Sequence, residues 1–224
     1  MRVPGLPHAV VFDFDGLILD TESVEYTTIA AQFSRHGLRY ELEAFARVVG
    51  SAWPTGWLDE LADRAVAPVD HDDVLAARRA HRDELLATLE PLPGVVGLLD
   101  ALADAAVAVA VASSSPRSWV EPLLERTGLR RRFAVVCTRD DVERAKPAPD
   151  LYALAVGRLG ASPERSVALE DSHNGCTAAK AAGLRCVAVP NAITAHQDFT
   201  HADLVVGSLA QVDLGALRHL VAAP

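Results

Sequence analysis

Residues 9–16 read AVVFDFDG, a short apolar run that ends in two aspartates separated by one phenylalanine. The run Ala9–Phe12 has no alternation of polar and apolar residues, which is typical of a strand buried on both faces of a parallel sheet. Charged side chains are costly inside such a sheet, so Asp13 and Asp15 belong at the end of the strand, where Gly16 allows a turn. The stretch therefore predicts a buried strand whose carboxyl end carries two carboxylates.

Similar apolar runs recur along the rest of the chain. They are Val107–Ala112, Ala134–Cys137, Ser166–Leu169, Cys186–Val189 and Leu204–Val206. Helical patterns lie between them, at Val95–Leu102, Arg117–Arg126, Pro149–Leu159 and Gly175–Ala182. Ser115 is expected to be the N-cap of the second of these helices, with Pro116 at its first position. The alternation of strand and helix predicts an α/β fold with a doubly wound, parallel, Rossmann-like sheet.

The segment from about residue 21 to residue 90 differs because it contains no convincing strand. Helices are expected at Ser23–His36, Leu42–Val48, Thr55–Ala65 and Asp72–Leu89. We therefore expect residues 1–20 and 91–224 to form a Rossmann-like catalytic core. Residues 21–90 are expected to form an all-helical cap domain, inserted over the carboxyl ends of the strands, where α/β sheets bind ligands.

Composition excludes several classes of protein. The chain has 224 residues and a net charge of −9, and a nucleic-acid surface is usually basic, so no nucleic-acid partner is expected. The longest apolar run, Ala105–Ala112, is too short to span a bilayer, so no membrane partner is expected either. Three cysteines without close spacing suggest neither a disulfide framework nor a zinc site. We expect a soluble protein in the reducing cytoplasm.

Polar residues follow four of the predicted strands, and in a doubly wound sheet these ends can meet in one crevice. They are Asp13 and Asp15, Ser113 and Ser114, Lys146, and Glu170 with Asp171. One lysine cannot neutralise four carboxylates, and like charges at contact distance repel strongly. A divalent cation with oxygen ligands resolves the repulsion, and Mg²⁺ is the usual choice where phosphate is bound. The pattern thus predicts a Mg²⁺ site beside a phosphate site, in which Ser113, Lys146 and backbone N–H groups hold phosphate oxygens.

Four motifs in this order resemble the haloacid dehalogenase-like superfamily, in the branch with a helical cap after the first strand. They are DFDGLILDTE at Asp13–Glu22, VASSS at Val111–Ser115, KPAPD at Lys146–Asp150 and EDS at Glu170–Ser172. Together they span most of the chain. The resemblance implies a phosphatase that acts on a small phosphorylated metabolite, such as a sugar phosphate, and that requires Mg²⁺.

The resemblance also implies a role for each matched residue. Asp13 would attack phosphorus and form an aspartyl-phosphate, and Asp15 would act first as general acid and then as general base. Ser113, Ser114 and Lys146 would bind the phosphoryl group. Asp13, Asp171 and the backbone carbonyl of Asp15 would bind the metal. Glu170 would be either a further ligand or a partner of the ligands, and the sequence leaves this open.

A β-phosphoglucomutase-like phosphomutase is the alternative activity. Such mutases carry a histidine at the position of Glu25 and an arginine just after the glycine of a cap loop, where this chain has Gly50-Ser51-Ala52. Both departures favour the phosphatase. A binding module that had lost catalysis would be expected to lack Asp13, Asp15 or Lys146, and all three are present.

The cap is expected to select the substrate, because the core recognises only phosphate and metal. Glu22, Arg47 and Trp53 are the candidate substrate contacts, although helix packing or solvation would also explain the latter two. The sequence does not name the metabolite. A monomer or a weak dimer is expected.

Overall fold

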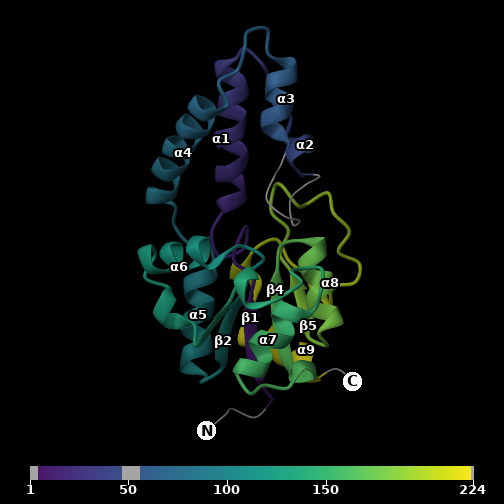
Figure 1. The fold of residues 1–224 in the computed structure, drawn as a ribbon. Helices are drawn as coiled ribbons and strands as arrows, with labels where there is room; N and C mark the ends of the chain where they lie inside the picture. The colour runs from purple at the N-terminus through teal and green to yellow at the C-terminus, as the bar shows by residue number, and fades with distance from the viewer. Residues whose placement is uncertain (1–4, 47–55, 223–224) are drawn as a thin grey trace.

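The computed structural model describes residues 5–46 and 56–222, and in this part of the chain a parallel sheet supports a layer of helices on each face (Figure 1). The strands are β1 (Ala9–Phe12), β2 (Ala108–Ala112), β3 (Val135–Cys137), β4 (Ser166–Glu170), β5 (Arg185–Ala188) and β6 (Leu204–Val205). Their order in the sheet is β3-β2-β1-β4-β5-β6. The order reverses between β1 and β4, and such a switch point is where doubly wound sheets bind ligands at the carboxyl ends of the strands.

Successive residues of each strand pack into opposite layers, which explains why the strands show no polar alternation. Val10 and Phe12 of β1 belong to one hydrophobic cluster, whereas Val11 belongs to the other. The first cluster contains residues of α5 (Val95–Asp104), α6 (Arg117–Arg126) and α9 (Leu214–Ala222). The second contains residues of α7 (Asp150–Arg158) and α8 (His173–Ala181). The predicted fold class is therefore confirmed.

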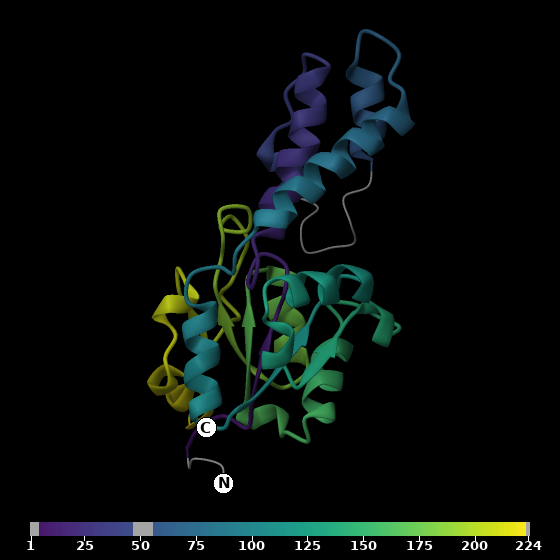
Figure 2. The ribbon, with the colours of Figure 1, turned by 90° about the vertical axis from the view of Figure 1, so that its left-hand side faces the viewer.

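The chain between β1 and α5 forms a separate group of helices above the carboxyl ends of the strands (Figures 1 and 2). These helices are α1 (Thr21–Arg35), α2 (Leu42–Ala46), α3 (Trp57–Arg64) and α4 (His71–Thr88), and we refer to them as the α1–α4 segment. They share a hydrophobic cluster that includes Ile29, Phe33 and Leu61 and that Ile193, after β5, joins from outside the segment. The segment leaves and rejoins the sheet at neighbouring points, where Leu92 N donates to Ile18 O at 2.9 Å.

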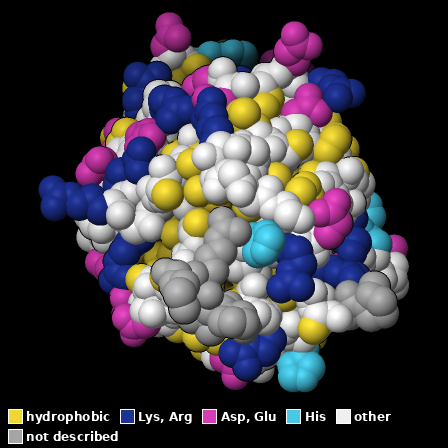
Figure 3. All heavy atoms as spheres, turned by 90° about the horizontal axis from the view of Figure 1, so that it is seen from below, with side chains coloured by type: hydrophobic (Ala, Val, Ile, Leu, Met, Phe, Trp, Pro, Cys, Tyr) yellow, Lys and Arg dark blue, Asp and Glu magenta, His cyan; other side chains and the backbone are white. Residues whose placement is uncertain are grey.

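The opposite end of the molecule has a mixed surface (Figure 3). Lys and Arg side chains alternate there with Asp and Glu and with uncharged atoms, so neither sign of charge dominates this face. Among the described residues, no helix is both long enough and apolar enough to cross a bilayer.

The predicted elements differ from the observed ones mainly at their ends. Helix α1 begins at Thr21 rather than Ser23, because Asp20 is its N-cap and accepts a hydrogen bond from Ser23 N at 3.2 Å. Helix α6 has the predicted bounds, but Pro116 rather than Ser115 is its N-cap. The Ser115 side chain points elsewhere, as described below. Short 3₁₀ helices at Arg130–Arg132, Arg139–Asp141, Pro163–Arg165 and Leu209–Gln211 were not predicted.

Candidate active site

The strand register places Asp13 at the switch point of the sheet. Phe12 pairs with Val111 of β2 on one side and with Leu169 of β4 on the other. Asp13 N continues this ladder with a hydrogen bond to Leu169 O at 2.9 Å. Residues that follow these strands therefore reach the same level at the carboxyl edge of the sheet.

Three carboxylates meet at this edge. Each of Asp13, Glu170 and Asp171 offers an oxygen within 4.8 Å of the others, and all three side chains are buried. Lys146 Nζ forms an ion pair with Asp13 Oδ1 and a second one with Glu170 Oε1 at 2.6 Å. One ammonium group thus faces three carboxylates, so negative charge remains uncompensated within the described residues. A set of buried carboxylate oxygens with excess negative charge fits a hard divalent cation such as Mg²⁺.

The pKa shifts in this cluster have the direction expected for crowded carboxylates. Burial raises the pKa of Asp13 to about 8, and the Glu170 and Asp15 charges add to the change while Lys146 opposes it. Burial also raises the pKa of Asp171 well above its ordinary value, and Glu22, Asp13 and Glu170 raise it further. Burial disfavours the charged form of Lys146, yet the Asp13 and Glu170 carboxylates outweigh it and raise the pKa of Lys146. A bound cation would favour the ionised form of each of these acids.

Both oxygens of Glu170 already accept hydrogen bonds from the protein. Oε1 accepts from Lys146 Nζ and from the Tyr152 hydroxyl at 2.5 Å. Oε2 accepts from Asp171 N at 3.2 Å, from Ser172 N at 3.4 Å and from Ser172 Oγ at 3.2 Å. With its lone pairs engaged in this way, Glu170 is better suited to hold Lys146 and Asp171 in place than to bind a metal directly.

Asp15 lies in a different environment, although only Phe14 separates it from Asp13. Its Oδ1 accepts from Thr21 Oγ1 at 2.7 Å and from the indole N–H of Trp119 at 2.8 Å. Its Oδ2 accepts from Ser115 Oγ at 2.6 Å and from Ser113 Oγ at 3.2 Å. The Asp15 side chain is therefore oriented by four donors and does not belong to the carboxylate cluster. Any part it takes in metal binding would involve its backbone carbonyl.

The turn after β2 carries the serines predicted to bind phosphate. Ser113 is fully buried and its hydroxyl contacts Asp15, whereas Ser114 Oγ is buried with no hydrogen-bond partner among the described residues. A buried hydroxyl without a partner is costly unless a ligand satisfies it. Two backbone N–H groups of this turn are already occupied, because Ser115 N donates to Ser113 Oγ at 3.0 Å and Arg117 N donates to Asp140 Oδ2 at 2.8 Å. The expectation that N–H groups at the helix start hold phosphate therefore does not extend to these two.

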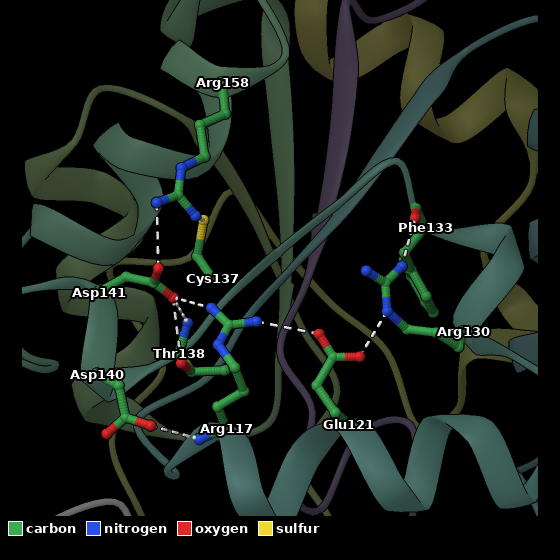
Figure 4. A network of polar contacts seen from close by, with 9 residues as sticks. All are labelled: Arg117, Glu121, Arg130, Phe133, Cys137, Thr138, Asp140, Asp141 and Arg158. Atoms are coloured by element: carbon green, nitrogen blue, oxygen red, sulfur yellow. Dashed lines mark hydrogen bonds and ion pairs between the residues drawn. The ribbon is translucent and has the colours of Figure 1, made fainter.

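A polar network fixes this turn to the chain that follows β3 (Figure 4). Arg117 and Arg158 approach the Asp141 carboxylate from α6 and α7, at 2.5 and 3.1 Å. Asp141 also accepts a hydrogen bond from Thr138 N at 2.9 Å. Arg117 further pairs with Glu121 at 3.0 Å. The start of α6 is thus tied to Asp140 and Asp141 after β3 through the backbone and the side chain of Arg117, close to the preceding serines.

Comparison with known proteins agrees with this arrangement. A family model described as haloacid dehalogenase-like hydrolase matches residues 7–183. The chain belongs to this family. It is therefore a hydrolase, as the motifs predicted.

Individual relatives of this haloacid dehalogenase-like hydrolase cover most of the chain. YhcW of Bacillus subtilis (strain 168), a provisionally named phosphatase, is 39% identical over 209 residues, which are 93% of this chain and 95% of the relative. Fructose-1-phosphate phosphatase YqaB of Escherichia coli (strain K12) is 36% identical over 185 residues, which are 80% of this chain and 95% of the relative. The crystal structure of CbbY from Rhodobacter sphaeroides in complex with phosphate superposes with a TM-score of 0.73 at 31% identity, covering 92% of this chain and 96% of CbbY.

The candidate substrate contacts of the hydrolase are only partly described. Arg47 and Trp53 lie outside the described residues. Glu22, at the start of α1, has a buried Oε2 atom for which residues 5–46 and 56–222 supply no hydrogen-bond partner. Burial raises the pKa of Glu22 well above its ordinary value, the Asp15 and Asp13 charges raise it further, and a hydrogen bond with Asn191 opposes the change.

Several residues that shape the site of this hydrolase were missed in the sequence. Thr21 and Ser115 lie within quoted motifs, and their hydroxyls could have been considered as partners of Asp15. Trp119, Tyr152 and Asn191 follow no chemical pattern in the sequence and reach the carboxylates only through folding. Trp57, at the start of α3, is buried in the hydrophobic cluster that the helices of the α1–α4 segment share.

Proposed function

We propose that this hydrolase is a Mg²⁺-dependent phosphatase that cleaves a small phosphorylated metabolite, such as a sugar phosphate, through an aspartyl-phosphate. The carboxylate cluster of Asp13, Glu170 and Asp171, with Lys146 at its centre, carries the proposal. The names of its relatives support the same class of reaction, since one is a fructose-1-phosphate phosphatase.

In the proposed reaction, Asp13 attacks phosphorus and the leaving oxygen takes a proton from Asp15. Lys146 stabilises charge on the transferred group, and Ser113 and Ser114 bind its oxygens. Asp15 then removes a proton from the water that cleaves the aspartyl-phosphate, so one carboxyl group acts first as acid and then as base. Mg²⁺, held by Asp13, Asp171 and the Asp15 carbonyl, would neutralise phosphoryl charge and favour the ionised form of Asp13.

We further propose that residues 21–90 act as a cap over a core formed by residues 1–20 and 91–224. The position of the α1–α4 segment above the strand ends supports this division (Figure 2). Glu22 is proposed to accept hydrogen bonds from hydroxyl groups of the substrate, because no described residue offers its buried Oε2 a hydrogen bond. Arg47 and Trp53 remain proposed contacts. A cytoplasmic location is proposed because all three cysteines are buried and free.

The test is phosphate release from a panel of sugar phosphates and nucleotides, with and without Mg²⁺. We expect Mg²⁺-dependent release by the wild type and a loss of at least about a thousand-fold in Asp13→Asn, because the nucleophile is removed. Asp104→Asn, on an exposed turn of α5, is the matched control and should retain full activity. Circular dichroism should show that both variants are folded.

Two results would contradict the proposal. Normal turnover by Asp13→Asn would exclude the covalent scheme. Conversion of β-glucose 1-phosphate to glucose 6-phosphate without net phosphate release would indicate the phosphomutase instead. The structure gives Glu25 a partner other than Asp15, since it forms a buried ion pair with Arg78.

A further inference from the structure

Asn191 joins two parts of the carboxylate site that are far apart in the sequence. It follows β5, and its Nδ2 donates to Asp171 Oδ2 at 2.8 Å and to the carbonyl of Gly16 at 3.2 Å. Gly16 closes the turn that carries Asp15, and Asp171 follows β4. One neutral amide therefore connects the turn after β1 with the carboxylate after β4.

The orientation of this amide is fixed by its own turn. Asn191 Oδ1 accepts from Ile193 N at 2.9 Å, from Thr194 N at 3.0 Å and from Thr194 Oγ1 at 3.2 Å. Since the two backbone N–H groups can only donate, the oxygen must face them, and the NH₂ group must face Asp171 and Gly16. Occupation of Asp171 Oδ2 by the amide also sets the direction of the other carboxylate oxygen.

The contact between these groups is close enough to require glycine at position 16. Gly16 has φ of +75°, and a Cβ there would lie 2.4 Å from Asp171 Oδ2 and 2.7 Å from Asn191 Nδ2. Any side chain would therefore displace the amide, the carboxylate or the turn.

The same turn reaches the α1–α4 segment. Ile193 is 3% exposed and belongs to the hydrophobic cluster that contains Ile29 and Phe33 of α1. Thr194 is fully buried beside it. The residues that hold the Asn191 amide are thus packed against the helices above the site.

We propose that Asn191 is a positioning residue for the cation site. It holds Asp171 and, through the Gly16 carbonyl, the turn that carries Asp15 in the arrangement that cation binding requires. Ile193 connects this arrangement to the position of the α1–α4 segment. The inference rests on the proposed Mg²⁺-dependent function, but its test measures binding rather than turnover.

The test is calorimetric titration of each variant with Mg²⁺. Asn191→Ser keeps an oxygen that can accept the N–H groups of the turn, but its side chain is too short to reach Asp171. We expect its Mg²⁺ affinity to fall about ten- to a hundred-fold, as is usual when a partner of a metal ligand is removed. Gln211→Ser is the matched control, because the Gln211 amide also accepts a backbone hydrogen bond but lies on an exposed 3₁₀ helix, and its affinity should equal that of the wild type.

Two further variants complete the experiment. Thr194→Val is isosteric and removes the hydroxyl that holds Asn191, so it should also weaken Mg²⁺ binding, and it carries the test if Asn191→Ser does not fold. Ile193→Ala leaves the backbone donor in place but loosens the contact with the α1–α4 segment. It should lower Mg²⁺ affinity several-fold. In the double variant with Asn191→Ser, the loss of affinity should differ from the sum of the two single losses, as is usual for coupled neighbours.

The outcomes are distinguishable. If Asn191→Ser, or Thr194→Val in its place, binds Mg²⁺ as tightly as the wild type, the positioning role is wrong. If Ile193→Ala alone is unchanged, the connection to the α1–α4 segment is wrong. If the wild type itself binds no Mg²⁺, the metal-dependent function fails and the positioning role fails with it.

Discussion

At the scale of single residues, the site depends on a glycine as much as on its acids. Gly175 lies in the first turn of α8, directly beside the buried Glu170 carboxylate. A Cβ at position 175 would lie 1.9–2.0 Å from the Glu170 carboxylate atoms, well inside contact distance. The absent side chain is therefore what allows Glu170 to hold Lys146 and Tyr152.

Gly175→Ala should therefore destabilise the protein by about 1–3 kcal/mol, because either Glu170 or the helix must move. It should also lower phosphate release, since Lys146 loses its orientation. Gly157→Ala is the matched control, because Gly157 lies in α7 with no atom within 4 Å of its Cβ position. There alanine should add roughly 0.5–1 kcal/mol through helix propensity. Urea unfolding measures both, and equal effects of the two substitutions would contradict the steric argument.

The sequence predicts site residues well where they follow a strand directly. Asp13 and Asp171 are recognisable because a charge at the end of an apolar run requires an explanation. Trp119 and Asn191 are not recognisable in the same way. An indole in a helix or an amide in a turn is common, and only the folded chain brings them to Asp15 and Asp171.

At the scale of elements, α1 and α4 are joined by a buried ion pair. Arg78 pairs with Glu25, and the two side chains are 12% and 8% exposed. Burial raises the pKa of Glu25 although Arg78 opposes the change, and burial lowers the pKa of Arg78. The Arg78 guanidinium also lies 5.3 Å from the centre of the Trp57 ring. The pair thus specifies how α4 sits on α1, at a cost in desolvation.

A double-mutant cycle tests this pair. Arg78→Met alone should destabilise the protein by about 2–3 kcal/mol, because the buried Glu25 carboxylate would keep only the more distant Arg82, at 3.9 Å, as a cationic partner. Combining it with Glu25→Leu should recover most of that loss. Glu60→Gln is the control, since the Arg64–Glu60 pair on α3 is 40% exposed at both side chains and should be worth less than about 1 kcal/mol. Urea unfolding at neutral pH gives the free energy of unfolding of the wild type, of Arg78→Met, of Glu25→Leu and of the double variant. If the losses of the two single variants add up to the loss of the double variant, the two residues act independently.

The strands and most helices could be predicted because burial on both faces and helix-end residues leave local signals. The bounds of β1 and α6 agree with the prediction residue by residue. The predicted N-cap of α6 was wrong because the Ser115 hydroxyl donates to Asp15 at 2.6 Å instead of capping the helix. Such competition between local and distant partners cannot be read from the sequence.

At the scale of the whole molecule, the buried carboxylates link stability to pH and metal. The pKa of Asp13 is about 8 in the folded protein and about 4 when it is unfolded. Because the pKa is raised in the folded state, protonation of Asp13 favours the folded protein. This contribution to the free energy of unfolding is complete below about pH 4 and is lost as the pH rises through about 8. Without metal, ionisation of Asp13 therefore opposes folding in this window.

Mg²⁺ should consequently raise Tm more at about pH 8 than at about pH 5, because it stabilises the ionised form that burial disfavours. The difference between the two pKa values corresponds to roughly 6 kcal/mol at most. Thermal unfolding with EDTA and with Mg²⁺ at both pH values measures the effect. Asp13→Asn is the control and should show much less pH dependence. An equal Tm increase at both pH values would contradict the prediction.

The hydrogen bond between Ile18 and Leu92 has a consequence for how such a protein can diversify. The intervening helices leave and rejoin the sheet at almost the same place. They therefore constrain the strands no more than a short loop at that position would. Evolution could replace or lengthen the α1–α4 segment without changing the strand register or the acidic residues that the sheet positions. If the α1–α4 segment selects the substrate, as proposed, separate stretches of one gene encode chemistry and selectivity, and each can change while the other is preserved.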